Sequence, residues 1–323
     1  MKNNLLVNIS PHLHGKESVS RIMWIVALSL IPAGLAGVYI FGLGALWVII
    51  LGVISAVISE MLLQLFTKKK VTVFDGSAFL TGLLLAYNLP PNVPFWLPIA
   101  GSVFAIAIGK QIFGGIGRNI FNPALVGRVF LMASWPKYMT TFTPTPKFLV
   151  WGFIKPMNYD AITSATPLAL IKEGRVLERV PYLDLFLGNR GGCIGEVCIL
   201  ALIIGAIFLL IRGYISWHIP FSYIVTTGLF TYLFGAKIFF TGDWLFHILS
   251  GGLILGAFFM ATDYVTSPLT AKGQIIFGFG CGLLTAIIRI WGGYPEGVSY
   301  AILMMNAATP IIDRYTKPRI YGS

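Results

Sequence analysis

A polar segment interrupts a chain that is otherwise almost entirely apolar, and it holds the residues best placed for chemistry. It includes the run Asp160-Ala161-Ile162-Thr163-Ser164-Ala165-Thr166-Pro167. Thr166 is predicted to cap a short helix that begins at Pro167 and ends at Gly174, because Thr favours the N-cap and Pro the first helical position. The free N–H groups and the dipole of a helix start favour a phosphate. The hydroxyl of Thr166 would then lie where a phosphate is stabilised, although ordinary helix capping explains the same local pattern.

Two asparagines form a second candidate site. Asn119 and Asn122 lie three residues apart in a Gly-rich stretch that leads to Pro123. On one face of a helix their amides would be able to hydrogen-bond the ring edge or the polyol chain of a cofactor. Turn and cap chemistry is routine for Asn-Pro, and the spacing alone favours that simpler interpretation.

Several ionisable residues fall within or beside apolar runs, where a charge is costly and usually faces a cavity or a partner. Arg128 and Glu60 are predicted inside helices, where they could pair with each other, bind a cofactor phosphate or line an ion path. Arg128 could also extend its side chain to the membrane surface. Asp263 follows an apolar run, where it would cap a broken helix or contact a cofactor. Asp243 and His247 lie four residues apart, which suits a proton relay or, more simply, a surface pair.

The three cysteines argue against a metal or iron–sulfur cluster within the chain. Cys193 and Cys198 are five positions apart, which differs from the spacing of a usual ligand pair, and Cys281 stands alone. We interpret all three as small apolar packing residues. The sequence contains no nucleophile triad and no phosphate-binding loop after a strand, so it does not indicate a self-contained hydrolase or ATPase.

The composition is that of a membrane protein. Hydrophobic residues make up 56% of the 323 residues and charged residues 11%, whereas a soluble domain carries about 25% charged residues. The mean hydropathy is +0.81. Long unbroken apolar runs favour spanning helices over a closed barrel. The net charge of +11 lies in loops without a basic soluble domain, so it indicates topology and contact with lipid headgroups and not nucleic-acid binding.

We predict an all-α polytopic membrane protein with about ten transmembrane helices, arranged as two inverted five-helix repeats. Residues 1–135 would form the first repeat, residues 136–192 an extracytoplasmic loop with the Thr166 site, and residues 193–323 the second repeat. The expected spans cover approximately residues 21–41, 44–66, 77–89, 95–113, 123–135, 193–211, 219–234, 244–261, 274–291 and 298–312.

The inverted arrangement is inferred from a similarity between the two halves of the sequence. Segment 82–88 resembles segment 256–262, a proline-bearing break follows each, and each half later reaches a Gly-Gly turn. With five spans per half, the second half enters the membrane from the opposite side. Many transport folds use this arrangement, with broken helices that meet near the middle.

The short loops predict the orientation. With the N-terminus inside, the inner segments carry most of the Lys and Arg residues, including the triplet at 68–70, and the short outer turns carry only Lys237 and Arg289. Both termini are therefore expected in the cytoplasm, and Thr166 on the other side of the membrane.

These features together resemble a family of redox subunits. Residues 160–166 resemble the flavinylation motif Asp-x-x-[Ser/Thr]-[Gly/Ser]-Ala-Thr, in which a flavin transferase joins the phosphate of FMN to the Thr hydroxyl. Over essentially its whole length the chain resembles the membrane-embedded D subunit of the Rnf complex and, more distantly, the B subunit of the sodium-pumping NADH:quinone reductase. The resemblance also rests on residues 114–128, with their Asn-Ile-Phe-Asn-Pro-Ala core, and on residues 260–268, where Tyr264 replaces the family's usual Pro.

The resemblance implies a flavoprotein with a urea-channel-like fold. FMN would be esterified to Thr166, with Asp160 and Ser164 recognised by the transferase, and a non-covalent riboflavin would lie near Asn119 and Asn122. Arg128 and Asp263 are further candidates for flavin contacts.

The implied complex passes electrons between ferredoxin and NAD and couples them to Na⁺ or H⁺ translocation. Its partners would be an outer subunit that bears FMN and subunits that bear iron–sulfur clusters. The complex would lie in a bacterial or archaeal cell membrane, and the chain is not expected to be active alone.

Two alternatives remain. The chain could be the quinone-reductase B subunit, which usually has a longer arm before the first span. It could also be a plain solute channel of the same architecture, which would not need the polar outer segment.

Overall fold

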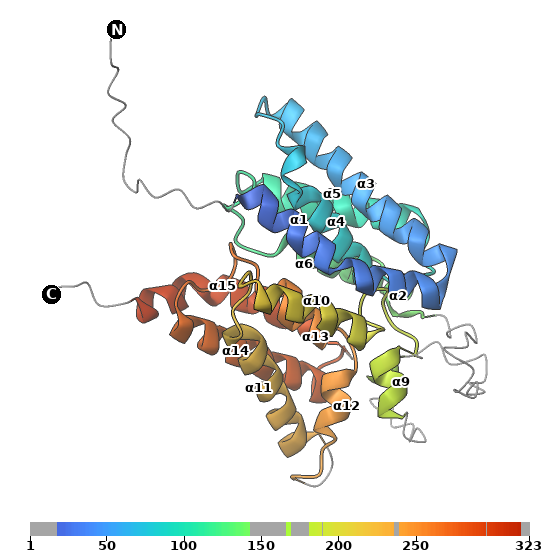
Figure 1. Ribbon diagram of the computed structural model, residues 1–323, viewed down its shortest axis with the longest axis vertical. Coiled ribbons are helices and arrows are strands. Elements are labelled where there is room, and N and C mark those ends of the chain that lie inside the picture. The colour runs from blue at the N-terminus through green and yellow to red at the C-terminus, as the bar shows by residue number, and fades with distance from the viewer. Residues whose placement is uncertain are drawn as a thin grey trace, which may run out of the picture.

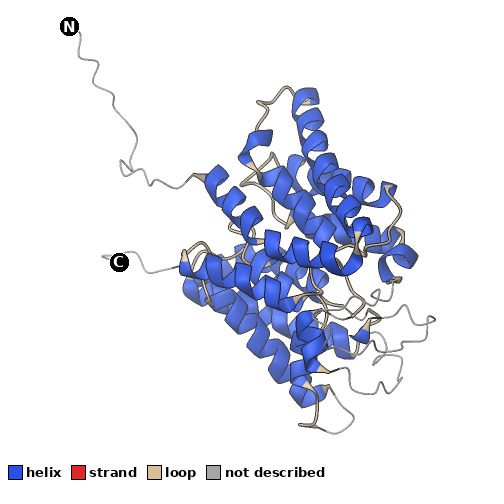
Figure 2. Cartoon of the chain, turned by 45° about the vertical axis from the view of Figure 1, so that its right-hand side comes forward, coloured by secondary structure: helices blue, strands red, loops and turns tan. Residues whose placement is uncertain are grey.

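The computed structural model describes residues 18–142, 166–168, 181–188, 190–235, 239–294 and 296–317. Within these ranges the chain forms helices and connecting turns without strands, as Figure 2 shows. The predicted all-α class is therefore confirmed. Asp160, Ser164 and the predicted helix end at Gly174 lie outside the described residues.

The helices before the polar segment follow the predicted apolar runs closely. They are α1 (Val19–Ser29), α2 (Ile31–Phe41), α3 (Leu43–Phe66), the 3₁₀ turn η1 (Val73–Asp75), α4 (Ser77–Tyr87), α5 (Trp96–Ile106), the π-helical η2 (Ala107–Gln111), α6 (Pro123–Ser134) and α7 (Pro136–Thr140). Asn122 caps α6, since its Oδ1 accepts from the N–H groups of Ala124 and Leu125 at 3.1 and 3.4 Å. Pro123 occupies the first helical position, where its missing N–H costs nothing.

The remaining described helices are α9 (Tyr182–Leu187), α10 (Ile199–Ile211), α11 (His218–Phe234), α12 (Trp244–Leu249), α13 (Leu253–Leu255), the π-helical η3 (Gly256–Met260), α14 (Ala271–Ile290) and α15 (Val298–Thr316). In Figure 1, helices α1–α6 group in the upper part of the molecule and α10–α15 in the lower part. The start of α1 and the end of α15 lie on one side, which we call the terminal side. Helix α9 lies on the opposite side, which we call the α9 side.

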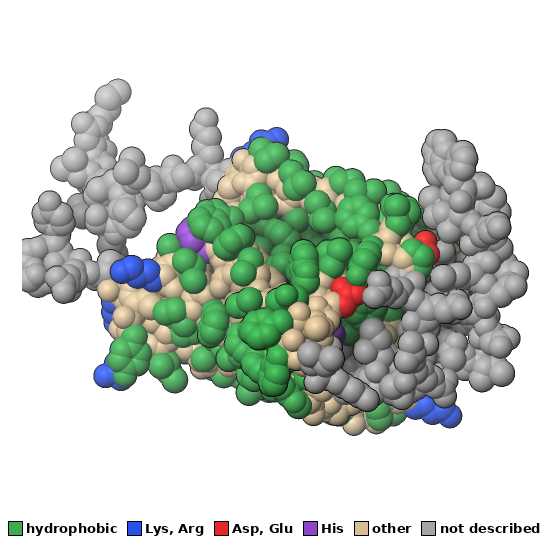
Figure 3. Space-filling model, turned by 90° about the horizontal axis from the view of Figure 1, so that it is seen from below, with side chains coloured by type: hydrophobic (Ala, Val, Ile, Leu, Met, Phe, Trp, Pro, Cys, Tyr) green, Lys and Arg blue, Asp and Glu red, His purple; other side chains and the backbone are tan. Residues whose placement is uncertain are grey.

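The surface and the helix lengths suit a membrane. Within the described part of the chain, three apolar segments are long enough to cross it, namely Val19–Phe41, Leu43–Phe66 and Ala271–Ile290. Large hydrophobic side chains such as Leu43, Phe66 and Ile211 are exposed, and hydrophobic side chains cover much of the face in Figure 3. Because so large an exposed apolar surface is unfavourable in water, we infer that lipid surrounds it.

The C-terminal end of α4 and the N-terminal end of α6 both lie near residues of the other half. Helices α4 and α6 have 11 and 12 residues, and at 1.5 Å per residue each spans only about half of a bilayer core of roughly 30 Å. Asn88, which follows α4, approaches the sulfur of Met260 at the end of η3, with Nδ2 to Sδ at 3.7 Å. The Asn122 amide donates to the Met260 carbonyl at 3.2 Å. Short helix ends from both halves thus meet inside the bundle.

The span predicted from Cys193 begins later than expected. Helix α10 starts at Ile199, and the residues before it form turns packed on the end of α4. The N–H groups of Ile194 and Gly195 donate to the carbonyls of Leu89 and Tyr87 at 3.1 and 2.9 Å. These bonds satisfy the carbonyl of the last α4 residue and that of Leu89, just beyond the helix. The apolar run therefore extends beyond the helix on its N-terminal side.

The span predicted over 244–261 is interrupted. Helix α12 ends at Leu249, and α13 begins at Leu253. Gly251 between them has a φ of +67°, a left-handed conformation that side chains with a Cβ rarely adopt. The break turns this part of the chain toward the buried charges described below.

Candidate functional site

Thr166 lies against the protein on the α9 side. It is 5% exposed and directly precedes two helical residues, Pro167 and Leu168, which agrees with the predicted helix start. Leu168 packs in a small cluster with Leu185 of α9 and Phe246 of α12. The apolar anchor at Leu168 holds the Thr166 backbone close to the end of the bundle.

A buried ion pair joins the two halves near this point. The guanidinium of Arg128, on α6, donates from Nη2 to Oε2 of Glu296 at 2.5 Å and from Nη1 to Oδ1 of Asn88 at 2.5 Å. Arg128 and Glu296 are 3% and 8% exposed. The structure thus excludes two of the alternatives for Arg128, namely its pairing with Glu60 and the extension of its side chain to the membrane surface.

The turns before α10 add a second carboxylate and a second guanidinium. Oε1 of Glu196 accepts from the Cys193 N–H at 3.0 Å, and Nη2 of Arg190 donates to the Glu196 carbonyl at 3.1 Å. A Cβ placed on Gly252 would lie 2.8 Å from Oε2 of Glu196 and 3.8 Å from Nη1 of Arg128. The Glu196 carboxylate therefore reaches the same helix break as Arg128.

Arg289 of α14 completes this group. It donates to the carbonyls of His247 and Ser250, the second at 3.0 Å, and so caps the end of α12. A Cβ placed on Gly251 would lie 2.9 Å from Cδ1 of Leu168, 3.1 Å from Nη2 of Arg289 and 3.6 Å from Oε1 of Glu296. Leu168 and the charges therefore meet at the glycine break. We call Arg128, Arg190, Glu196, Arg289 and Glu296 the charge cluster.

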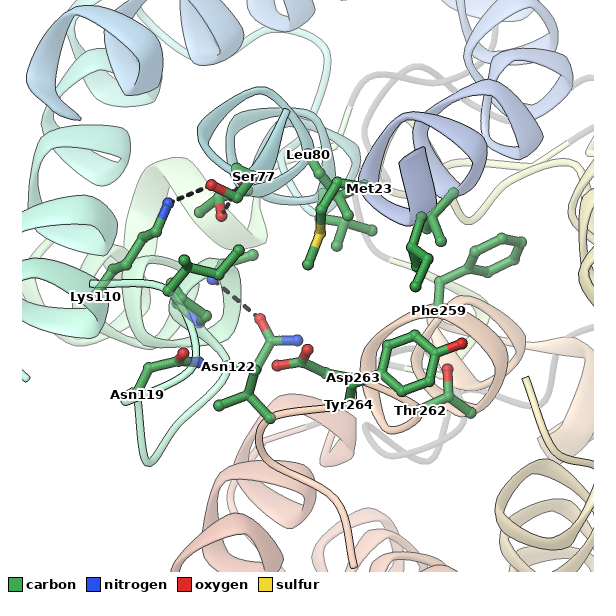
Figure 4. A pocket seen from close by; sticks show the side chains of 18 of the residues that line it. Met23, Ser77, Leu80, Lys110, Asn119, Asn122, Phe259, Thr262, Asp263 and Tyr264 are labelled. Atoms are coloured by element: carbon green, nitrogen blue, oxygen red, sulfur yellow. Dashed lines mark hydrogen bonds between the residues drawn. The ribbon is translucent and has the colours of Figure 1, made fainter. Parts of the chain in front are cut away.

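A cavity on the terminal side brings together three of the predicted residues. The space it encloses, counted with the part open to solvent, is about 770 Å³. Asn119, Asn122 and Asp263 line it, with apolar side chains from α1, α4, α10 and η3. Figure 4 shows the two asparagines and Asp263 around the opening between the halves. Arg128 is not part of this cavity.

The asparagine amides are largely engaged in local structure. Asn119 donates from Nδ2 to the Phe121 carbonyl at 3.1 Å. Asn122 caps α6 and contacts Met260, and its own N–H donates to Oδ1 of Asn306 at 3.3 Å. Turn and cap chemistry, the simpler interpretation of the Asn-Pro sequence, is therefore present, and both residues face the cavity as well.

A second buried ion pair borders the cavity. Nζ of Lys110, in η2, lies 2.7 Å from Oε1 of Glu60 and donates to Oγ of Ser77 at 2.5 Å. Gln64 and Gln111 donate to the same carboxylate at 3.1 and 3.0 Å. Glu60 thus has three donor side chains around it, while Lys110 is the member that lines the cavity (Figure 4).

Asp263 lies at the cavity, and the Asp243–His247 pair differs from expectation. Asp263 accepts from the Thr266 hydroxyl at 3.2 Å, and it also lines the cavity. Burial raises the pKa of its carboxyl above the usual range, and hydrogen bonds from Thr266 and Val265 oppose that shift. Asp243 caps α12 through the Phe246 N–H at 3.0 Å. His247 is only 8% exposed, so the surface-pair interpretation is wrong for it.

Sequence reasoning found the cavity residues and missed most of the charge cluster. Arg190, Glu196 and Glu296 carried no motif, and Arg289 entered only as a marker of topology. A usable signal existed, because each of them flanks an apolar run beside paired or nearby glycines. Among the described residues no group of three or more His, Cys, Asp or Glu side chains is arranged to hold a metal ion.

Comparison with known proteins identifies the family. The model of the NQR2, RnfD, RnfE family matches residues 6–322. The D subunit of the Na(+)-translocating ferredoxin:NAD(+) oxidoreductase complex of Acetobacterium woodii is 52% identical over 321 residues, covering 99% of this chain and 96% of the relative. The D subunit of the proton-translocating ferredoxin:NAD(+) oxidoreductase complex of Clostridium ljungdahlii is 49% identical over 331 residues, covering 100% and 97%.

A more distant relative gives the same result. The D subunit of the ion-translocating oxidoreductase complex of Escherichia coli (strain K12) is 38% identical over 350 residues, covering 97% of each chain. Together with the helical membrane fold, these matches show that the chain belongs to the NQR2, RnfD, RnfE family as a D-type subunit of an Rnf complex.

Proposed function

We propose that the chain is the membrane-embedded flavin carrier of an ion-translocating ferredoxin:NAD⁺ oxidoreductase, with FMN joined through its phosphate to the hydroxyl of Thr166. The observation that carries this proposal is the position of Thr166 at a helix start, two residues before Leu168, which approaches the glycine break that Arg289 also reaches. Such surroundings suit a phosphate ester. The names of the relatives at 52% and 49% identity support the reaction.

Bound FMN supplies a carrier that accepts one or two electrons. The chain's own residues supply placement. Leu168 fixes the backbone beside Thr166 through Leu185 and Phe246, so the ester bond would hold the carrier at the end of the bundle. The flavin transferase and the other Rnf subunits, including an FMN-bearing outer subunit and iron–sulfur subunits, would be its partners. The coupled ion would be Na⁺ or H⁺, and the Thr166 side would be extracytoplasmic.

We further propose riboflavin as the occupant of the cavity on the terminal side. The cavity is mostly apolar, which suits a flavin ring, and Asn119, Asn122 and Asp263 supply hydrogen-bonding groups at one edge. Lys110 adds a cation held in place by Glu60 and Ser77. Two carriers at opposite ends of the bundle would suit electron passage across the membrane.

Mass spectrometry of the 160–172 peptide tests the covalent site. Made together with its transferase, the chain should carry an added FMN on this peptide and a fluorescent band in a denaturing gel. Thr166→Ala should abolish both signals, and Thr166→Ser should retain part of them because it keeps a hydroxyl. An unmodified peptide from an active complex would rule out the covalent assignment.

A further inference from the structure

The positive charge on the wall of the terminal-side cavity belongs to an ammonium group that is already paired. Lys110 is the cationic side chain among the described residues that line the cavity. Its Nζ lies 2.7 and 2.8 Å from the two carboxylate oxygens of Glu60 and donates to Oγ of Ser77 at 2.5 Å. An ammonium has three N–H groups, so these contacts use all of its donors. Asp263, which also lines the cavity, adds no positive charge in either protonation state.

Glu60 acts on the cavity from behind Lys110. It is 1% exposed and does not belong to the described residues that line the cavity. Gln64 and Gln111 donate to its carboxylate at 3.1 and 3.0 Å, which fixes it against Lys110. Figure 4 shows Lys110 at the cavity wall, directed toward Ser77. A ligand in the cavity would therefore meet a cation whose charge is cancelled by a carboxylate that the ligand does not touch.

Two helix starts that border the cavity are capped from within the chain. Oδ1 of Asn122 accepts from the N–H groups of Ala124 and Leu125 at the start of α6. Oδ1 of Asp75 accepts from the N–H of Ser77 at 2.8 Å at the start of α4, which places a carboxylate there. Free N–H groups at a helix start attract a phosphate, and a side-chain acceptor on them weakens that attraction. These helix starts therefore offer little to a phosphate.

We propose that Glu60 is a specificity-determining residue of this cavity, because by cancelling the charge of Lys110 it makes the cavity accept an uncharged flavin and reject a flavin phosphate. This inference rests on the proposed function for the flavin. A phosphate brought against an ion pair without free donors loses its hydration and gains no partner. Removal of the Glu60 charge would free the Lys110 ammonium and turn the same wall into a phosphate site.

The test compares riboflavin with FMN, which differ only in the phosphate. The full chain is made without the transferase, so that it carries no covalent flavin, and both flavins are titrated by the quenching of their fluorescence. The wild-type chain should bind FMN at least about tenfold more weakly than riboflavin. In Glu60→Gln the affinity for FMN should rise at least about tenfold, because a charged donor becomes available, while that for riboflavin changes by less than about threefold.

Gln is the substitute of choice at position 60 because it preserves the size of the side chain. Oε1 of Gln111 is buried without a hydrogen-bond partner, so it can accept from the new amide. The double variant Glu60→Gln/Lys110→Met removes both charges of the pair. It should therefore lose the gain in FMN affinity, which separates the effect of the freed ammonium from a general loosening of the cavity.

Asp243 provides the matched control. It lies at the start of α12 and accepts from the Tyr182 hydroxyl of α9 at 2.7 Å, away from the cavity lining. Asp243→Asn also removes one carboxylate, and it should leave the ratio of the two flavin affinities unchanged. A gain in FMN affinity as large as that of Glu60→Gln would show that net charge, and not the Lys110–Glu60 pair, sets the preference.

A second measurement needs no flavin. At constant ionic strength, inorganic phosphate should raise the unfolding midpoint of Glu60→Gln by at least about 2 °C more than that of the wild-type chain or of the double variant. Equal responses of the three chains would contradict the charge argument.

The flavin titrations distinguish this inference from the proposed function. Equal wild-type affinities for riboflavin and FMN, or no gain in FMN affinity in Glu60→Gln, would overturn the role of Glu60 and leave a flavin in the cavity. Failure of the wild-type chain and of the variants to bind either flavin would reject the flavin itself, and with it this inference.

Discussion

Arg128 on α6 and Glu296, which lies between α14 and α15, join the two halves of the chain, with Nη2 and Oε2 2.5 Å apart. Removal of one partner leaves the other charge buried, which costs about 3–5 kcal/mol, whereas replacement of both by apolar residues costs much less. We therefore expect Glu296→Gln to lower the free energy of unfolding by that amount and Arg128→Met/Glu296→Met to recover a large part of it. Thermal unfolding in detergent measures both, and a double variant as unstable as the single one would contradict the expectation.

The Lys110–Glu60 pair should behave in the same way on the terminal side. Lys110→Met leaves the Glu60 carboxylate with only the two glutamine amides, so we expect a loss of about 3–5 kcal/mol in the free energy of unfolding. Lys69→Met is the control, since Lys69 is exposed and should change stability by no more than about 0.5 kcal/mol. Similar midpoints for the two variants would show that the buried pair contributes little.

Gly82 allows the close contact of α4 with α3. A Cβ on Gly82 would lie 2.6 Å from the carbonyl oxygen of Gly52 and 2.8 Å from Cα of Val53, and neither backbone atom can move aside cheaply. Gly82→Ala should therefore lower the free energy of unfolding by about 1–3 kcal/mol. The same substitution at Gly293, where no atom lies within 4 Å, should be close to neutral. Equal effects at both positions in thermal unfolding would refute the packing argument.

Asp263 should make stability depend on pH. Its pKa is raised in the folded chain by burial, so the folded state binds the proton more tightly than the unfolded state, whose pKa is about 3.9. The resulting stabilisation is fully present at the acid end and is lost as the pH rises through the raised pKa. Asp263→Asn should remove this part of the slope in unfolding midpoints measured from pH 4 upward, and an unchanged slope would exclude Asp263 as its source.

The helices could be predicted from the sequence because their apolar runs are long. The partners of the buried charges could not be predicted in this way. The bounds of α3, α11 and α14 lie within a few residues of the predicted spans. Hydropathy misplaced the start of α10, because Cys193, Ile194 and Val197 continue the apolar run on its N-terminal side despite Glu196. The hydrogen bonds of Ile194 and Gly195 to the chain at the end of α4 show that this segment forms turns and not a helix.

In the candidate sites, too, the features set by neighbouring residues could be predicted and those set by tertiary contacts could not. Local sequence indicated the Thr166 helix start and the capping role of Asn122, which depend on neighbouring residues alone. Arg128 was expected to face a partner, but Glu296 lies 168 positions away along the chain, and no periodicity links positions so distant. The charge cluster depends on tertiary contacts among four separate segments, so it became visible only when the chain was folded.

The π-helical segment η2 has a consequence for chain length. A π turn holds one residue more than an α turn, and η2 ends with Lys110 and Gln111, both of which donate to Glu60. Excision of a single residue from 107–108 would restore regular α winding and change the direction of both side chains relative to that carboxylate. The direction of the buried Lys110 ammonium group therefore depends on the one extra residue of the π segment. A deletion there would disturb the Lys110–Glu60 ion pair without replacing either of its residues.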